Sequence, residues 1–482
     1  MRTFTQILTF VSILLMAVAR GDERNFEITG ASLLGDAGDE NHVKVSAILK
    51  DGSILIGGHF GSSPVTHGIR ALPGVDAESP WALLRLTGDG REILGGMRFR
   101  GPLSQIVLDG QDQVYIAAGR DGLLILSPRL DQLIRHHKDE GFVYRVSVGE
   151  KGHYAFLVPD NVGQQENTGG NGTIHIFDPA GRKLGEGSGH RHTLDIALDE
   201  ANEVVLHTGW RQARSWQPDG NQRVLPVQIA YIRALNFDGS LNWRGYDWST
   251  TRGDDRFLNR SDNNMADTRG YRAAMGPDGL LYVAFESAGG NHIFRYSPLD
   301  VMENVSSRFS SAPDHFHRFH NTRAEHKTFI GVYNPADGSF VRGQHFTARL
   351  NDGRGSAWRS HQGELAVAEN GEVWLAGHSG SGVPHTFVQP TRPGYVGGAT
   401  LHGFSPEMDR RIYGTYHGNG RTHTVSVRTL PGQSEPTIVY GGYLPKPANE
   451  EHFHAVHPLQ AQRGGGEQDG FFVVLNGTGG QR

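Results

Sequence analysis

Residues 43–58 read VKVSAILKDGSILIGG, an apolar run with alternating polar residues, an Asp-Gly pair, and a second apolar run that ends in glycine. Alternation with a period of two is typical of a β-strand, and Asp-Gly is a favoured two-residue hairpin turn. The stretch therefore predicts a β-hairpin. The same pattern occurs seven times, at residues 43–58, 105–119, 145–158, 194–209, 271–285, 364–377 and 424–442.

A second hairpin follows each of the first six copies, at residues 82–94, 123–134, 174–185, 232–243, 329–343 and 401–414. The seventh copy is followed by one strand only, residues 470–476, and its missing partner is the apolar segment 26–35 near the N-terminus. Two hairpins in each of seven repeats predict an all-β, seven-bladed β-propeller with four-stranded blades. An N-terminal strand would complete the last blade and leave no open sheet edge.

This pattern also predicts the domain organisation. Residues 1–19 carry Arg2, an apolar run and a small-x-small cleavage pattern at 17–19, which predict a signal peptide and a secreted or periplasmic protein. An uncleaved N-terminal anchor is the alternative, and no later stretch has the roughly 20 apolar residues of a membrane span. Residues 20–482 form a single domain, with insertions at 287–327 and 443–469. Its blades are expected at about 43–94, 98–136, 141–187, 191–246, 270–346, 360–416, and 421–476 plus 26–35.

The amino-acid composition excludes several kinds of functional site. The chain has no cysteine, which excludes thiolate nucleophiles and thiolate metal sites, and its formal net charge of −5 argues against nucleic-acid binding. Only seven of its 46 basic residues are lysine. Arginine presents a planar fork that suits carboxylate, phosphate or sulfate, although genomic base composition could produce the same bias.

The repeats resemble the secreted bacterial β-propeller repeat family, whose units read apolar-VAV-x-x-DG-x-x-YV-x-G and then F-x-x-K-x-D-x-x-G. The most similar stretch is ASLLGDAGDENHVKVSAILKDGSILIGGHF, residues 31–60. The resemblance extends over most of the mature chain, while the fourth to seventh repeats depart from it by long insertions. It implies the fold and no single activity, because that family is defined by its architecture.

Most of the unusual residues fall on one predicted face, here called the top face, which holds the loops between second and third strands and those between blades. Histidine and arginine gather at these strand ends, so we expect a funnel at the mouth of the central channel. Any one of these histidines can also be explained as an ordinary packing residue. The predicted ligand-binding residues are His42, His59, Arg100, His190, His207, Arg269, Arg359, His378, His417, Arg421 and His423.

Two insertions carry alternating histidines that suit a metal such as zinc. Alternate residues of an extended segment point the same way, although His-x-His in a loop is often coincidental. An acidic stretch from Asp254 to Asp267 offers oxygen donors for calcium, without the spacing of a known calcium loop. The predicted metal ligands are His315, His317, His320, His452, His454 and His457.

Three functions remain open from the sequence. The funnel suits an acidic ligand such as an anionic polysaccharide, with Trp210, Trp358 and Tyr271 stacking on sugar rings. An enzyme of polysaccharide lyase type, or a metal-dependent one, could use the same funnel; some such lyases are similar in architecture, and this analogy stays at the level of the fold. A scaffold for a protein partner is the third. If the protein is a lyase, the expected catalytic residues are Tyr271, Arg272, His192 and His361.

Overall fold

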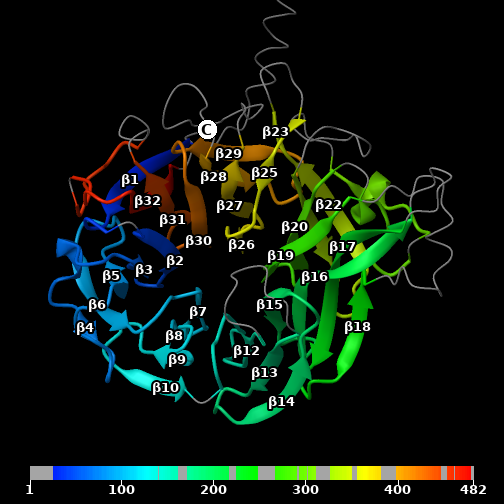
Figure 1. The fold of residues 1–482 in the computed structure, drawn as a ribbon, viewed down its shortest axis with the longest axis horizontal. Helices are drawn as coiled ribbons and strands as arrows, with labels where there is room; N and C mark the ends of the chain where they lie inside the picture. The colour runs from blue at the N-terminus through cyan, green and yellow to red at the C-terminus, as the bar shows by residue number, and fades with distance from the viewer. Residues whose placement is uncertain are drawn as a thin grey trace, which may run out of the picture.

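The computed structural model describes residues 25–38, 40–138, 140–160, 171–216, 224–247, 266–289, 292–300, 302–310, 326–349, 355–380, 398–446, 453–460 and 462–478. The predicted signal peptide, residues 1–19, lies outside them. The described strands form eight sheets, seven of which are arranged in a ring around a central axis (Figure 1). The predicted all-β, seven-bladed propeller is confirmed.

In each blade the chain runs from an innermost strand outward to the rim (Figure 1). Blade one contains β2 (His42–Ile48), β3 (Ile54–His59), β5 (Trp81–Leu86) and β6 (Ile93–Phe99). Blade two contains β7 (Gln105–Leu108), β8 (Val114–Ala117), β9 (Leu123–Leu126) and β10 (Leu133–His137). Blade three contains β11 (Arg145–Val148), β12 (Tyr154–Val158), β13 (Thr173–Phe177) and β14 (Lys183–Ser188). The two-residue β4 (Arg70–Ala71) pairs with β6 in parallel.

Blades four to seven follow the same order. Blade four contains β15 (Thr193–Asp199), β16 (Val204–Trp216), β17 (Val224–Asn236) and β18 (Leu241–Gly245), and blade five contains β19 (Thr268–Met275), β20 (Leu281–Ser287), β21 (Lys327–Tyr333) and β22 (Phe340–Phe346). Blade six contains β25 (Trp358–Arg359), β26 (Leu365–Val367), β27 (Val373–Ser379), β28 (Gly398–Phe404) and β29 (Arg411–Tyr416). Blade seven contains β30 (Arg421–Arg428), β31 (Thr437–Pro445) and β32 (Gln468–Thr478). Three short 3₁₀ turns (Pro64–Thr66, Ile293–Arg295 and Ser306–Arg308) and the small pair β23 (Ala348–Arg349) and β24 (Gly355–Ser356) lie in the connections.

The first strand closes the ring. β1 (Asn25–Leu34) pairs antiparallel with β32, from Asn25 opposite Thr478 to Leu34 opposite Gly470. The prediction that an N-terminal strand completes the last blade is therefore confirmed. Phe26 of β1 also packs edge-to-face on Trp374 and Tyr413 of blade six, so this strand joins two blades.

The Asp-Gly turns explain why the repeats fold into hairpins. Gly52 has φ 85° and Gly239 has φ 88°, in the left-handed region that glycine enters without strain. The preceding aspartates hold these turns, since Asp51 accepts a hydrogen bond from the Ser53 N–H (2.9 Å). Asp238 accepts one from Ser240 in the same way (2.8 Å).

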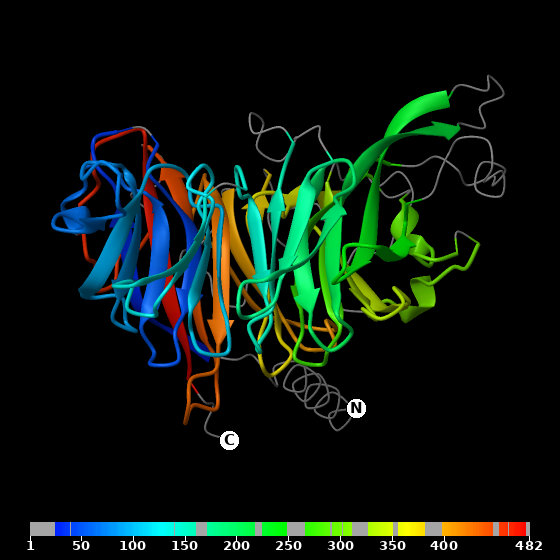
Figure 2. The same ribbon diagram turned by 90° about the horizontal axis from the view of Figure 1, so that it is seen from below.

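Three features differ from the sequence pattern. The outer strand of blade one extends to Phe99, beyond the predicted end at 94, and Arg98 inside it donates to Thr66 rather than opening the next blade. The inner strand of blade six is split into β25 and β26 around Gln362, which has φ 66°. The strands β16 and β17 of blade four pair over thirteen residues each and project from the top face as an arm (Figure 2).

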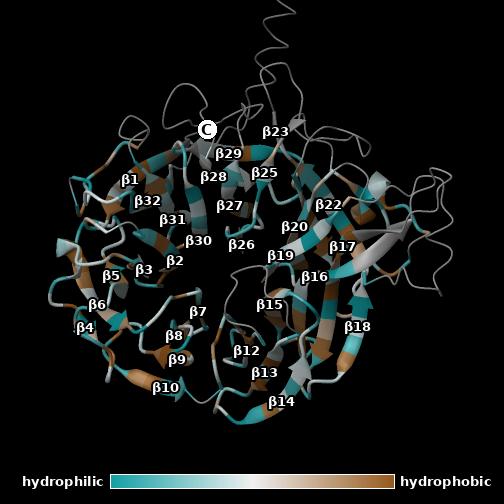
Figure 3. Ribbon diagram, in the orientation of Figure 1, coloured by the Kyte–Doolittle hydropathy of each residue, from teal (hydrophilic) through white to brown (hydrophobic). Residues whose placement is uncertain are grey.

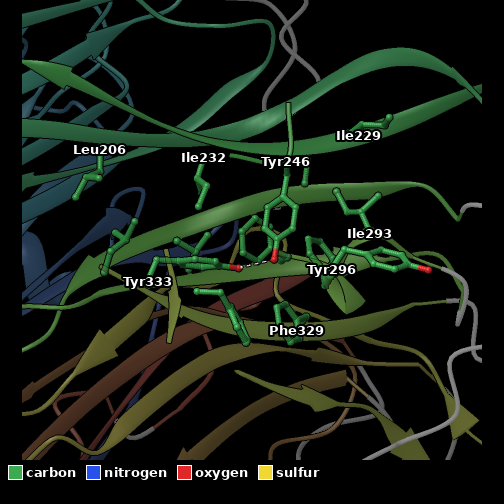
Figure 4. Close-up of a cluster of buried hydrophobic side chains, with 14 of the residues drawn as sticks. Leu206, Ile229, Ile232, Tyr246, Ile293, Tyr296, Phe329 and Tyr333 are labelled. Atoms are coloured by element: carbon green, nitrogen blue, oxygen red, sulfur yellow. Dashed lines mark hydrogen bonds between the residues drawn. The ribbon is translucent and has the colours of Figure 1, made fainter. Parts of the chain in front are cut away.

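Apolar residues recur along the strands of the ring (Figure 3). Their side chains fill the spaces between neighbouring blades. Between blades four and five, Ile232 of β17 packs with Phe329 and Tyr333 of β21 (Figure 4). The Tyr333 hydroxyl donates to the Tyr246 hydroxyl at 3.2 Å within this apolar cluster. Both faces of each blade are thus buried, which holds the inner strands and their top ends in place.

Candidate functional site

The top ends of the inner strands surround a cavity of about 370 Å³, here called the mouth cavity. A second cavity of about 430 Å³ lies further along the channel, and the two share Lys44 and Glu364 in their walls. Aromatic, basic and acidic side chains from five blades meet at the mouth cavity. Its lining includes His42, Trp81, Tyr144, Arg145, Arg272, Gln362, Glu364, His423 and Tyr443.

Four charged side chains, here called the floor network, lie between the two cavities. Arg145 Nη1 is 2.6 Å from Glu364 Oε1, and Arg145 Nε is 3.7 Å from Asp195 Oδ1. Arg272 Nε is 3.5 Å from the same Glu364 oxygen. Burial raises the pKa of Asp195 to about 6, against the attraction of Arg145 and Arg272 and with added repulsion from Glu364. Two arginines and two carboxyl groups thus join the inner strands of blades three, four, five and six.

A second cluster is centred on Glu286 of β20, whose side chain is 2% exposed. His326 Nδ1 lies 2.8 Å from Glu286 Oε1, and Arg359 Nη2 and Arg269 Nη1 lie 3.2 Å and 3.7 Å from the same oxygen. Burial alone would raise the pKa of Glu286, but the hydrogen bond from His326 and the charge of Arg359 lower it to about 2. This buried carboxylate therefore holds two arginines from neighbouring blades beside the channel.

Tyr271 and His361 connect this cluster to the mouth cavity. Arg269 Nη1 donates to the Tyr271 hydroxyl oxygen at 3.3 Å, and the rings of Tyr271 and His361 are 6.0 Å apart. Arg421 Nη1 lies 3.4 Å from His361 Nε2 and donates to Gln362 Oε1 at 2.5 Å. Gln362 lines the mouth cavity, so the contacts are continuous.

The contact with Arg421 determines which His361 nitrogen carries hydrogen. A guanidinium can only donate, so His361 Nε2 accepts and Nδ1 bears the proton of the neutral ring. Burial lowers the pKa of His361 to about 3, which keeps the ring neutral near pH 7. Its Nδ1 is buried and has no hydrogen-bond partner among the described residues. His361 is therefore a buried donor without an acceptor in the part of the chain that the structure describes.

The four predicted catalytic residues are brought close together. His192, with φ 49°, stacks on Trp210 with 3.7 Å between ring centroids, and Trp210 packs against Tyr271. Arg272 belongs to the floor network and donates to the Tyr271 carbonyl at 2.6 Å. The ring of His378, a predicted ligand-binding residue, lies 4.8 Å from that of His361. Distant parts of the sequence thus meet on one side of the channel.

Three more predicted histidines gather where blades one and seven meet, and His423 among them lies on the same strand, β30, as Arg421. The ring of His42 lies 6.0 Å from those of His59 and His423, and 5.4 Å from the Trp81 ring. Burial lowers the pKa of His42 to about 3 and that of His423 well below its usual value. Both lack a charge near pH 7, and with Trp81 and Tyr443 they form an aromatic wall.

The remaining predicted ligand-binding residues lie away from the mouth cavity. His190 Nε2 and Arg211 Nε are 3.3 Å and 2.6 Å from Asp247, which also binds Arg233, while the fully buried His207 packs beside Tyr231. His417 follows the outer strand of blade six and is buried, where its Nε2 hydrogen-bonds the Tyr440 hydroxyl at 2.7 Å. Arg100 is about half exposed and donates to the Gly74 carbonyl near the rim of blade one. The sequence places these residues at strand ends, but it does not show whether their side chains point into the channel.

Only two of the six predicted metal ligands lie within the described residues. His315, His317, His320 and His452 lie outside the described residues, as do Asp254, Asp255 and Asp262 of the acidic stretch. His454 and His457 are exposed, and Val456 between them bridges Ala31 of β1 through two backbone hydrogen bonds. Within the described ranges, no group of three histidine, aspartate or glutamate side chains is placed to hold a metal ion.

Sequence reasoning missed the acidic residues of the floor network. Asp195 and Glu364 pair with its arginines, yet neither was a predicted site residue. A signal was present, because Asp195 interrupts the apolar inner-strand sequence LDIALD, where a charge requires a partner. Arg145 also begins an inner strand, as the predicted site residue Arg421 does, and it was not predicted.

The chain matches no protein-family model, and no curated protein matches it. The seven-bladed ring is therefore shown by the structure, and the bacterial repeat family remains a resemblance of the repeats. No helix in the described part of the chain is long and apolar enough to cross a membrane.

Proposed function

We propose that this protein binds an acidic ligand, such as an anionic polysaccharide, at the mouth cavity. The observation that carries the proposal is the environment of Arg421, which adjoins the cavity through its contact with the lining residue Gln362. In the part of the chain that the structure describes, its guanidinium contacts the neutral side chains of His361 and Gln362 and forms no ion pair with a carboxylate. A half-buried guanidinium in such surroundings suits a carboxylate or sulfate, which accepts two parallel hydrogen bonds from it.

The rest of the cavity supports a sugar rather than a small inorganic anion. Trp81, Tyr144 and Tyr443 line it and offer faces on which sugar rings can pack. They replace the residues that the sequence suggested for stacking: Trp358 is fully buried with its Nε1 donating to Thr400, and Trp210 is already stacked on His192. A polymer would meet such a site outside the cytoplasm, in keeping with the apolar N-terminal segment.

Affinity measurements with an Arg421→Gln variant test the proposal. Calorimetric titration with sulfated and with uronate oligosaccharides should show binding weakened by about ten- to a hundredfold, the value of one charge-assisted contact. Arg182→Gln is the matched control, since Arg182 is 79% exposed in a turn of the opposite face. Equal affinities for the two variants would place the ligand elsewhere and overturn the proposal.

One observation favours β-elimination of a uronate polymer as a second candidate. Arg269 donates to the hydroxyl oxygen of Tyr271 and can stabilise its phenolate form, so Tyr271 is suited to remove the proton next to the carboxylate. The carbon–oxygen bond to the leaving sugar then breaks, a carbon–carbon double bond forms, and the leaving oxygen takes up a proton. Release of unsaturated product distinguishes this function from binding alone.

A further inference from the structure

The floor network has an unusual charge balance for the base of an anion site. Arg145 and Arg272 both line the mouth cavity, yet Glu364 and Asp195 neutralise them at neutral pH. The side chains of Arg145, Asp195 and Arg272 are at most 3% exposed. Because water screens such charges poorly, a change of one charge here acts strongly on a ligand in the cavity.

Asp195 is the member of the network whose charge can change. It lies on β15 and faces Arg145 of β11, Arg272 of β19 and Glu364 before β26. Backbone N–H groups of Ala273 and Ile196 donate to its two oxygens, both at 3.0 Å. Opposite it on β16 is Thr208, which carries no charge. Arg145 lies 1.1 Å closer to Glu364 than to Asp195, so Asp195 is the less well compensated carboxylate.

We propose that the floor network is a proton-controlled switch of ligand affinity, in which protonation of Asp195 leaves Arg145 and Arg272 in excess and strengthens the binding of an acidic ligand above them. This inference rests on the proposed function of the mouth cavity. It adds regulation: the protein binds its ligand more tightly in a mildly acidic environment than at neutral pH.

The transition falls in a useful range because burial raises the pKa of Asp195 to about 6. The histidines around the cavity do not provide this change of charge. Burial lowers the pKa of His42 and His361 to about 3 and that of His378 to about 2, so these rings stay neutral between pH 5 and pH 8. His423 is shifted in the same direction. Asp195 is therefore the group at the cavity floor expected to gain a proton in this interval.

The test compares the wild-type protein with Asp195→Asn, using a dextran sulfate oligomer whose charge does not change between pH 5 and pH 8. Wild-type affinity should rise by about tenfold from pH 8 to pH 5, the effect of one added charge near the ligand. The variant, which lacks the negative charge at every pH, should bind at pH 8 as tightly as the wild type does at pH 5. An unchanged pH dependence in the variant would overturn the switch while leaving the binding function intact.

A measurement on the wild-type protein alone covers the case in which the variant does not fold. If ligand and proton favour each other, binding near pH 6 must take up protons, because linkage is reciprocal. Calorimetry in buffers of different ionisation enthalpy should detect a fraction of a proton taken up at pH 6 and almost none at pH 8. Binding without proton uptake at pH 6 would refute the switch. Absence of binding at every pH would instead refute the proposed function.

Discussion

Glu286 shows what a single buried carboxylate does in this site. It draws Arg269 of its own blade, Arg359 of the next blade and His326 to one oxygen, and so fixes the two guanidinium groups beside Tyr271. Without its charge, the two arginines would repel each other and lose their common partner. Removing one member of a buried ion pair is strongly destabilising, because the remaining charge is left uncompensated.

Glu286→Gln should therefore destabilise the protein by about 3 kcal/mol at pH 7, the free energy that corresponds to a pKa of about 2 in place of the ordinary 4.5. The folded-state pKa is lowered, so this stabilisation is complete above pH 4.5 and declines as the pH falls towards 2. Urea unfolding at pH 7 and pH 3.5 should show a smaller difference at the lower pH. Glu303→Gln, at a 45% exposed carboxylate paired with Arg308, is the control and should change the stability by less than about 0.5 kcal/mol.

At the scale of single residues, the sequence predicted which side chains are unusual better than it predicted their partners. Tyr271, His361, Arg269 and Arg359 were expected near the channel, and the structure brings them together. Arg100 and His417 were expected there for the same reason, but one points to the rim and the other into the core. The direction of a side chain at a strand end depends on local twist and on neighbouring loops, which sequence alternation does not specify.

Among the elements, β1 is the strand that closes the ring. Its backbone completes the ladder of blade seven along β32, and its Phe26 fills the space against Trp374 and Tyr413 of blade six. Closure by one strand from the far end of the chain removes the sheet edge that would otherwise attract another molecule. The top ends of β25, β27 and β30, which hold much of the site, belong to the two blades that β1 connects.

Phe26→Ala should lower the free energy of unfolding by about 3 to 5 kcal/mol, the range for losing a buried aromatic side chain. Glu27→Ala at the next, exposed position of the same strand should cost less than about 0.5 kcal/mol. Chemical denaturation of the two variants measures both values. If Phe26→Ala were as stable as Glu27→Ala, the closing strand would not contribute to the core as described.

The elements also mark the limit of sequence-based prediction. Hairpins with Asp-Gly turns were recognisable because a local pattern determines them. The arm formed by β16 and β17 was not expected, since the second strand was thought to end at Gly209 while pairing continues to Trp216. The gap between β25 and β26 was missed as well, and it places His361 and Gln362 in the interruption of the strand. Irregularities of this kind depend on tertiary contacts.

For the whole molecule, the ring converts seven similar hairpin pairs into one asymmetric channel. Arg269, Arg359, Arg421 and Glu286 come from blades five to seven and form its arginine side. His42, His423 and Trp81 form the aromatic wall next to this side, where blades one and seven meet. The floor network separates the mouth cavity from the lower one. A chain-like acidic ligand can thus place an acid group on the arginine side and a sugar ring on the aromatic wall.

The position of the acid group of a bound ligand tests this account most directly. Electron density should be recorded for crystals of the protein with a sulfated disaccharide at pH 5. We predict a sulfate within hydrogen-bond distance of the Arg421 guanidinium, above an intact floor network. A sulfate bound instead in the lower cavity, beside Arg428, or on the outer rim would contradict the assignment of the mouth cavity as the binding site.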